Sequence, residues 1–336
     1  MIARRVQRRV LRVLRRAGFD VGQTASVDGV VVFGYQLHRR DRPRPDFEAP
    51  VGGVNLAIDR AEIEQLWSDY RRHPLNRDSG RIWNQEADFG ETILDVDLTD
   101  VRADNAYVYQ NRHSGAVKYL VSAQWVQLAD RHGLLAVLDE DGAFGAACIR
   151  LGGRLWSRDL MDSVLEIGFL LDNLPAGYLG DATVLDIGAG YGRLAHRLVT
   201  AVDGVRVLCA DGVAHSTVLS RAYTEHRGLG ERVQVLTLDE SGHLDEHIDL
   251  VTNIHSFSEM PLSAVRWWLD RVAEHQVEYL FVVPNRPGPA LNDGTDLMPL
   301  LDERGYDLVV HRPKYDDPLV AKHALAPAQY YLLQRR

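Results

Sequence analysis

Hydrophobic and polar positions change their pattern near residue 181. Beyond it, short runs rich in β-branched residues alternate with stretches of helical spacing, an order that indicates βαβ units and a mostly parallel sheet. Parallel strands are covered on both faces, so they form continuous apolar runs. The predicted strands span residues 183–187, 205–210, 233–238, 248–253, 279–284, 306–311 and 328–333. No helix separates the last two, so we expect them to pair antiparallel at the sheet edge.

The first half of the chain has mainly helical spacing. The predicted elements are helices over residues 59–73, 117–131 and 158–173 and strands over 30–33 and 134–138. Asp59 is a plausible N-cap for the first helix, and Asp141-Gly142 is predicted to form a turn. We therefore expect a mainly helical cap over residues 1–175, on the acceptor side, and a cofactor-binding domain over 176–336.

The first 17 residues alternate arginines with aliphatic residues. This spacing places the two kinds of side chain on opposite faces of a helix. The simplest interpretation is a basic amphipathic helix whose arginine face is solvated. The alternatives are weak contact with a membrane surface or with an acidic partner.

Composition and charge narrow the class of protein. The 336 residues are 46% hydrophobic and 25% charged, which is ordinary for a soluble globular protein. The formal net charge of −9 argues against binding nucleic acid, since that depends on neutralising phosphates. Cys148 and Cys209 each lie in an apolar run, so we expect no disulfide and a cytoplasmic location. We find neither a secretory signal nor an apolar run of about 18 residues.

A glycine-rich turn follows the first strand of the second half. The segment Asp186-Ile-Gly-Ala-Gly-Tyr-Gly192 continues into a helical stretch over 193–200. Glycines let the backbone approach a ligand closely, and a helix N-terminus offers unpaired N–H groups. The dinucleotide fingerprint is G-x-G-x-x-G. Here Arg193 stands where its third glycine would be, which disfavours an NAD-dependent oxidoreductase.

Three acidic residues stand at successive predicted strand ends. Asp186 suits a cationic group such as the amino group of methionine. Asp211 can accept hydrogen bonds from two ribose hydroxyls, and Asp239 can meet the exocyclic amine of adenine. Ligands of open α/β sheets lie at these carboxyl ends. The plainer interpretation of each acid is a helix N-cap or a solvated loop residue.

The segment Val184-Leu-Asp-Ile-Gly-Ala-Gly-Tyr-Gly-Arg-Leu-Ala195 resembles motif I of S-adenosylmethionine (SAM)-dependent methyltransferases. The segment Asn253-Ile-His-Ser-Phe-Ser-Glu-Met260 resembles the sugar O-methyltransferase family, as do residues 138–145 and 157–163. The match spans about residues 115–285. One departure is Asp211-Gly-Val213, where the family tends to have Asp-Leu-Pro.

This resemblance implies a class I methyltransferase fold, SAM as cofactor and a sugar-containing acceptor, either a nucleotide sugar or a glycoside. The residues expected at the cofactor are Asp186, Gly188, Ala189, Gly190, Tyr191, Gly192, Asp211, Gly212, Asp239 and Asn253. No metal site is predicted, although Asn292, Asp293 and Asp296 form an acidic loop of oxygen ligands that would suit Mg²⁺. The plainer interpretation of that loop is a solvated turn.

A neutral sugar hydroxyl is a weak nucleophile, so a general base is expected near the methyl group. His255 is the first candidate, because an ordinary imidazole is neutral and basic at cellular pH. Glu259 would orient it or bind a hydroxyl, and it could equally be a helix-start carboxylate. His215 is the second-choice base.

The acceptor side has aromatic and cationic candidates in the first half of the chain. Stacking on a sugar ring would involve Trp83, Tyr107, Tyr109 or Trp156, and a phosphate would involve Arg112, His113 or Arg158. Core packing and surface ion pairs are the plainer interpretations. Two other functions stay open: a methyltransferase for another small molecule or a protein side chain, and a binding protein that has the fold without turnover.

Overall fold

The computed structural model describes residues 19–22, 31–32, 35–39, 47–48, 60–76, 101–102, 115–285, 288–291 and 293–336, the first three ranges by their backbone alone. The predicted basic helix over residues 1–17 lies outside these residues. So do Trp83, Tyr107, Tyr109, Arg112, His113 and Asn292. The predicted run over 30–33 is present in part, as strand β2 (Val31–Val32).

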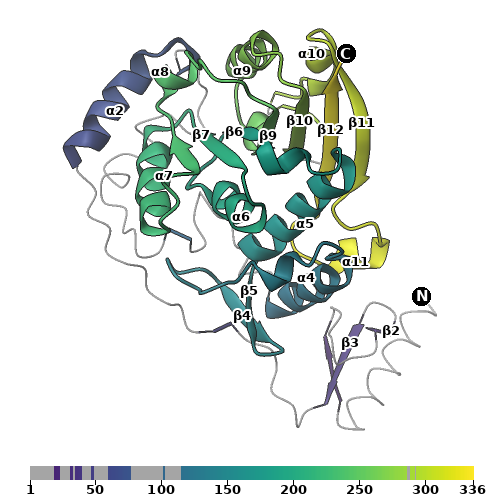
Figure 1. The fold of residues 1–336 in the computed structure, drawn as a ribbon. Coiled ribbons are helices and arrows are strands. Elements are labelled where there is room, and N and C mark those ends of the chain that lie inside the picture. Colours follow the sequence, from purple (N-terminus) through teal and green to yellow (C-terminus); the bar gives the residue numbers. More distant parts are fainter. Residues whose placement is uncertain are drawn as a thin grey trace.

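A seven-stranded sheet forms the centre of the described structure (Figure 1), in the order β11-β12-β10-β9-β6-β7-β8. Its strands are β6 (Thr183–Ile187), β7 (Arg206–Ala210), β8 (Val233–Val235), β9 (Leu250–His255), β10 (Tyr279–Pro284), β11 (Tyr306–Pro313) and β12 (Gln329–Arg335). The first five are parallel, whereas β12 pairs antiparallel with both β10 and β11. The predicted Rossmann-like sheet with an antiparallel edge hairpin is therefore confirmed.

Strand order reverses beside β6. The chain moves outward from β6 to β7 and β8 on one side, and from β9 to β10 on the other. Loops that leave β6 and β9 therefore turn away from each other and leave a crevice at their carboxyl ends, where ligands of open α/β sheets bind. This is the end of the sheet that has the glycine turn.

Helices cover both faces of the sheet. They are α2 (Arg60–Arg72), α4 (Ala116–Ala129), α5 (Arg158–Asn173), α6 (Arg193–Ala201), α7 (Ala214–His226), α8 (Leu238–Ser241), α9 (Leu262–Glu274), α10 (Leu297–Asp302) and α11 (Pro318–His323), with 3₁₀ turns η1 (Pro74–Asn76), η5 (Leu134–Ala136), η6 (Tyr178–Asp181) and η7 (Ser256–Ser258). One apolar core joins α4, α5 and α6 to the sheet, and another joins α2, α9 and α10 to it.

The helix α5 shows how the first half of the chain belongs to this sheet. Ser157 caps it by accepting from the N–H of Leu160, and its apolar face is buried. Phe169 lies 5.1 Å, between ring centroids, from Phe281 of β10 and 5.2 Å from Tyr330 of β12. The hydrophobic core is thus continuous across residue 175, where the sequence suggests a domain boundary.

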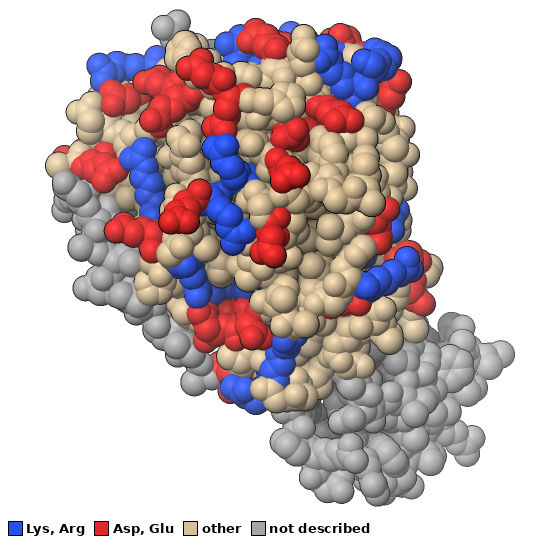
Figure 2. Space-filling view, viewed as in Figure 1, with Lys and Arg blue, Asp and Glu red and all other residues tan. Residues whose placement is uncertain are grey.

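The first half also contains more strand than its helical spacing indicates. A three-stranded sheet joins β1 (Phe19–Gly22), β2 and β3 (Tyr35–Arg39), and a hairpin joins β4 (Cys148–Leu151) to β5 (Arg154–Ser157). Among the described helices, none combines the length and apolar composition that crossing a bilayer requires. Acidic and basic side chains interleave over the face shown in Figure 2.

Two predicted strands are wrong in whole or in part. The strand predicted over 134–138 is absent, and Leu134–Ala136 form the 3₁₀ turn η5. Both carboxylate oxygens of Asp130 accept backbone N–H groups there, those of Leu134 at 2.9 Å and Leu135 at 2.8 Å. These bonds take the donors that a strand would use. The strand predicted over 233–238 ends at Val235, because a capping box between Thr237 and Glu240 starts the short helix α8.

Candidate cofactor site

The predicted strand, turn and helix over residues 183–200 are present as β6, a glycine turn and α6. Gly188, Gly190 and Gly192 have φ values of 76°, 59° and 87°, which side chains disfavour. A Cβ atom at Gly188 would lie 2.1 Å from Oγ of Ser256, so the turn closes only without one. A Cβ atom at Gly190 would meet nothing within 4 Å. The turn therefore presents bare backbone to open space at Gly190.

Two carboxylates flank this turn from adjacent strands. Asp186 is 4% exposed and accepts from Oγ1 of Thr252 at 2.7 Å. Asp211 accepts from the N–H of Gly190 at 3.0 Å and from that of Val213 at 2.9 Å. The first of these bonds ties the end of β7 directly to the turn after β6. The structure therefore brings together the two acids predicted for the amino group and the ribose.

Burial disfavours the charged form of both acids. It raises the pKa of Asp186 to about 6, although the hydrogen bond from Thr252 opposes this. It raises the pKa of Asp211 to about 7, and the negative charge of Asp186 adds to this effect. Two enclosed carboxylates within electrostatic reach of each other are stabilised by a cationic or hydroxyl-bearing ligand. The arrangement can therefore hold a ligand that has both kinds of group.

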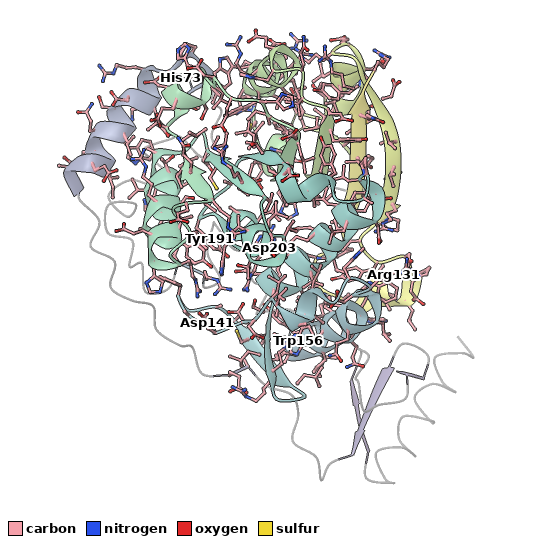
Figure 3. The ribbon with its side chains drawn as sticks, viewed as in Figure 1. His73, Arg131, Asp141, Trp156, Tyr191 and Asp203 are labelled. Carbon is pink, nitrogen blue, oxygen red and sulfur yellow. The ribbon has the colours of Figure 1, made fainter. Side chains whose placement is uncertain are left out.

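The other residues of the turn make their contacts through the backbone or, at Tyr191, through the side chain. The N–H groups of Gly188 and Ala189 donate to the carbonyl oxygen of Ala210, at 2.8 Å and 3.2 Å. Tyr191 is 3% exposed, and its hydroxyl donates to Asp159 of α5. The predicted contact of Tyr191 with the cofactor is therefore limited to its backbone, because its side chain is committed to the interior (Figure 3).

The interior partner of Tyr191 is an ion network that the sequence does not suggest. Arg102 is fully buried; it donates to Glu140 at 2.7 Å and 3.1 Å and to Asp159 at 2.9 Å. Arg197 of α6 donates to the same Glu140 at 3.1 Å. Because these residues are far apart in the chain, no local motif marks them. The network holds the first half of the chain against the glycine turn.

Asn253, predicted at the cofactor, makes hydrogen bonds that fix the end of β9. It is 1% exposed, and its amide group donates to the carbonyl oxygen of Ile187 at 2.9 Å and to Oγ of Ser256 at 2.6 Å. Its Oδ1 accepts from the N–H of Phe257 at 2.9 Å. Both amide N–H groups and the oxygen are thus engaged inside the protein. Asn253 fixes η7 against the start of the glycine turn.

Asp239 also differs from its prediction. It lies in α8 rather than at a strand end, and its side chain is 76% exposed. Its Oδ1 lies 4.0 Å from Nε2 of His73, which Figure 3 labels, and burial lowers the pKa of that imidazole. The capping box at Thr237 moves the acid out of the strand and onto the surface. The structure therefore does not place Asp239 with Asp186 and Asp211.

The predicted base His255 ends β9 with a φ of 71°, a left-handed conformation that is rare for residues other than glycine. Burial, together with the nearby cations Arg158, Arg193 and Lys314, lowers its pKa to about 3, although Asp162 opposes this. The imidazole is therefore neutral at cellular pH, as expected, but less basic than the ordinary value on which the prediction rests.

The surroundings of His255 are charged. Asp162 of α5 accepts from Nε of Arg158 at 3.1 Å and from the buried Nζ of Lys314. Glu166 accepts from Nη1 of Arg193 at 2.7 Å. Asp159 and Asp186 also lie within electrostatic reach of Arg193. Acidic and basic side chains therefore gather together near His255, and of these Arg158 is the one that the sequence suggests for holding a phosphate.

The other candidates either make hydrogen bonds within the chain or are buried. Oε1 of Glu259 accepts from Nδ2 of Asn285 at 2.7 Å, across the ends of β9 and β10. His215 is 1% exposed within α7, and burial lowers its pKa to about 4. Trp156 is 2% exposed and packs in the core. Asp293 accepts from the N–H of Thr295, and Asp296 caps α10. Within the described ranges, no group of three metal-binding side chains is found.

Similarity to known proteins is found in the fold and not in the sequence. No protein-family model matches the chain, and no curated protein matches it. Similar solved structures include the magnesium protoporphyrin IX methyltransferase of Synechocystis with bound SAH, at a TM-score of 0.39 and 16% identity over 52% of this chain and 81% of that one. The cyclase SpnF has a TM-score of 0.42 and 14% identity, over 64% of this chain and 96% of that one. M. capricolum TrmK in complex with S-adenosyl-homocysteine has a TM-score of 0.33 and 15% identity, over 46% and 62%. These values are too low to assign a reaction.

Proposed function

We propose that this chain is a SAM-dependent methyltransferase that methylates a sugar hydroxyl. The observation that carries the proposal is the junction of the glycine turn with Asp211, whose carboxylate accepts from the N–H of Gly190. Bare backbone, an enclosed acid for the ribose hydroxyls and a second acid for the amino group, Asp186, match the parts of this nucleoside. When bound, SAM supplies a methyl group on a sulfonium, which is an activated leaving group.

The chain's own residues would do the remaining work. Alignment of the acceptor hydroxyl with the methyl group accounts for much of such a rate increase. His255, at the carboxyl end of β9, is proposed to take the hydroxyl proton on its neutral imidazole. Glu259 and Asn285 would bind the sugar beside it, because their hydrogen-bonded pair spans the ends of β9 and β10.

Three basic side chains near His255 support an acceptor that has a phosphate. Arg158, Arg193 and Lys314 all lie near enough to lower the pKa of His255. A nucleotide sugar would add negative charge there, whereas a neutral glycoside would not. We therefore propose nucleotide sugars ahead of glycosides. The alternatives are another small molecule or a protein side chain as acceptor, and binding without turnover; an activity screen over these acceptor classes, with and without a chelator, separates them.

Cofactor binding is tested by calorimetry with SAM, SAH and NAD on the full chain and on two glycine variants. Gly190→Ala places a methyl group in the space proposed for the ligand and should weaken SAH binding at least tenfold. Gly228→Ala is the matched control, because Gly228 has a φ of 67° and equally open surroundings but follows α7 and is not part of the turn. Both should lose about 1 kcal/mol of stability from the left-handed backbone. Binding of NAD in place of SAH would overturn the proposal.

A further inference from the structure

Residues 60–76 contact the elements that follow β7 and β8, and the first of these begins with the loop of Asp211. Figure 1 shows α2 beside α7, with its end at α8. The hydroxyl of Tyr70 is 2.8 Å from Oγ1 of Thr217 in α7 and accepts from the N–H of Leu238 in α8 at 3.0 Å. One buried tyrosine therefore joins this segment to the elements that follow β7 and β8.

The turn η1 continues from there onto the ribose loop. Nδ2 of Asn76 donates to the carbonyl oxygen of Gly212 at 3.1 Å and to that of Tyr70 at 3.0 Å. A Cβ atom at Gly212 would lie 3.5 Å from Cδ2 of Leu75, in ordinary contact. Leu75 is 5% exposed and belongs to the core that includes Ala210 and Leu238. Its side chain thus stands beside the residue that follows Asp211.

We propose that Leu75 is a cofactor-positioning residue, which supplies the apolar wall for the purine that a side chain at position 212 would otherwise supply. A nucleoside whose ribose is held by Asp211 extends from the end of β7 toward the neighbouring β8, beneath η1. Gly212 offers no side chain to the base, and the isobutyl group of Leu75 takes that place. The inference rests on the proposed function, since it requires a nucleoside at Asp211.

The test compares two leucine truncations in the same segment. Leu75→Ala should weaken SAH binding about tenfold, which is about 1.4 kcal/mol. Leu66→Ala is the matched control: Leu66 is 8% exposed in α2 and in the same core, so its loss should lower the melting temperature and leave the SAH dissociation constant within twofold. Both constants are measured by calorimetry at a temperature where all variants are folded.

A second substitution that restores SAH binding would distinguish loss of the apolar wall at Leu75 from a general loss of stability. Gly212 does not have a left-handed φ, so a side chain is compatible with its backbone. Combining Leu75→Ala with Gly212→Leu returns an isobutyl group to the same space from the other backbone, and SAH binding should recover. Unchanged SAH affinity in Leu75→Ala would overturn this inference alone. Failure of the wild-type chain to bind SAH would overturn it together with the proposed function.

Discussion

Replacing Arg102 by methionine should lower the free energy of unfolding, because it breaks the buried ion network. Arg102 is the fully buried partner of both Glu140 and Asp159, whose side chains are 0% and 2% exposed. Methionine fills similar space but leaves two buried carboxylates with fewer partners. Glu140 retains Arg197 and Ser157, and Asp159 retains the hydroxyl of Tyr191.

The size of the effect follows from the pKa of Glu140. Its partners, Arg102 first among them, lower that pKa from 4.5 to about 2 against the opposing effect of burial. A shift of this size corresponds to about 3 kcal/mol of stability at pH 7. Breaking a buried pair by removing one partner typically costs about 3–5 kcal/mol. Because other partners persist, we expect a loss of about 3 kcal/mol.

Urea unfolding followed by tryptophan fluorescence at pH 7 measures this loss. Arg206→Met is the control, since Arg206 pairs with Glu246 at 2.9 Å but is 51% exposed, and such pairs contribute at most about 1 kcal/mol. A carboxyl group whose pKa is lower in the folded state stabilises the fold fully at a pH above its unfolded-state pKa. This contribution is lost as the pH falls toward the folded-state pKa. The gap between wild type and Arg102→Met should therefore narrow below about pH 4.5. Equal losses in the two variants would refute the reasoning.

Two further predictions concern the proposed reaction. SAH should bind more tightly as pH rises from about 6 to 8, because the ribose hydroxyls donate to ionised Asp211 and burial raises the pKa of Asp211 to about 7. Calorimetry should show a weaker pH dependence in Asp211→Asn. A wild-type affinity that does not change with pH would contradict the prediction. With saturating SAM, kcat should not fall between pH 8 and pH 5, because the pKa of His255 is lowered to about 3. His255→Asn, which keeps a polar side chain but removes the basic ring, should lower kcat about 10²-fold with SAH affinity unchanged; unchanged kcat would remove His255 as the base.

The sheet was predictable because its strands are buried on both faces, so each is a continuous apolar run. The errors arose where a polar side chain competes locally for backbone groups. Asp130 holds Leu134–Ala136 in a 3₁₀ turn, and Thr237 ends β8 early. Such competition depends on a few hydrogen bonds rather than on periodicity.

The site was predictable where its polar side chains lie at the carboxyl ends of strands. Asp186 and Asp211 meet at the glycine turn because parallel strands share their carboxyl edge. Partners that are distant in the chain left no such sign. Arg102 lies 57 residues from Asp159, and Asn76 lies 136 residues from Gly212. Their juxtaposition follows from tertiary packing, which no single segment encodes.

The packing of Phe169 bears on how the chain folds. Its ring is covered by Phe281 of β10 and by Tyr330 of β12, both more than 100 residues further along the chain. Contacts between such distant residues close long loops, and the entropy of loop closure is lost before the contacts form. We therefore expect the docking of α5 on this end of the sheet to be a slow step of folding.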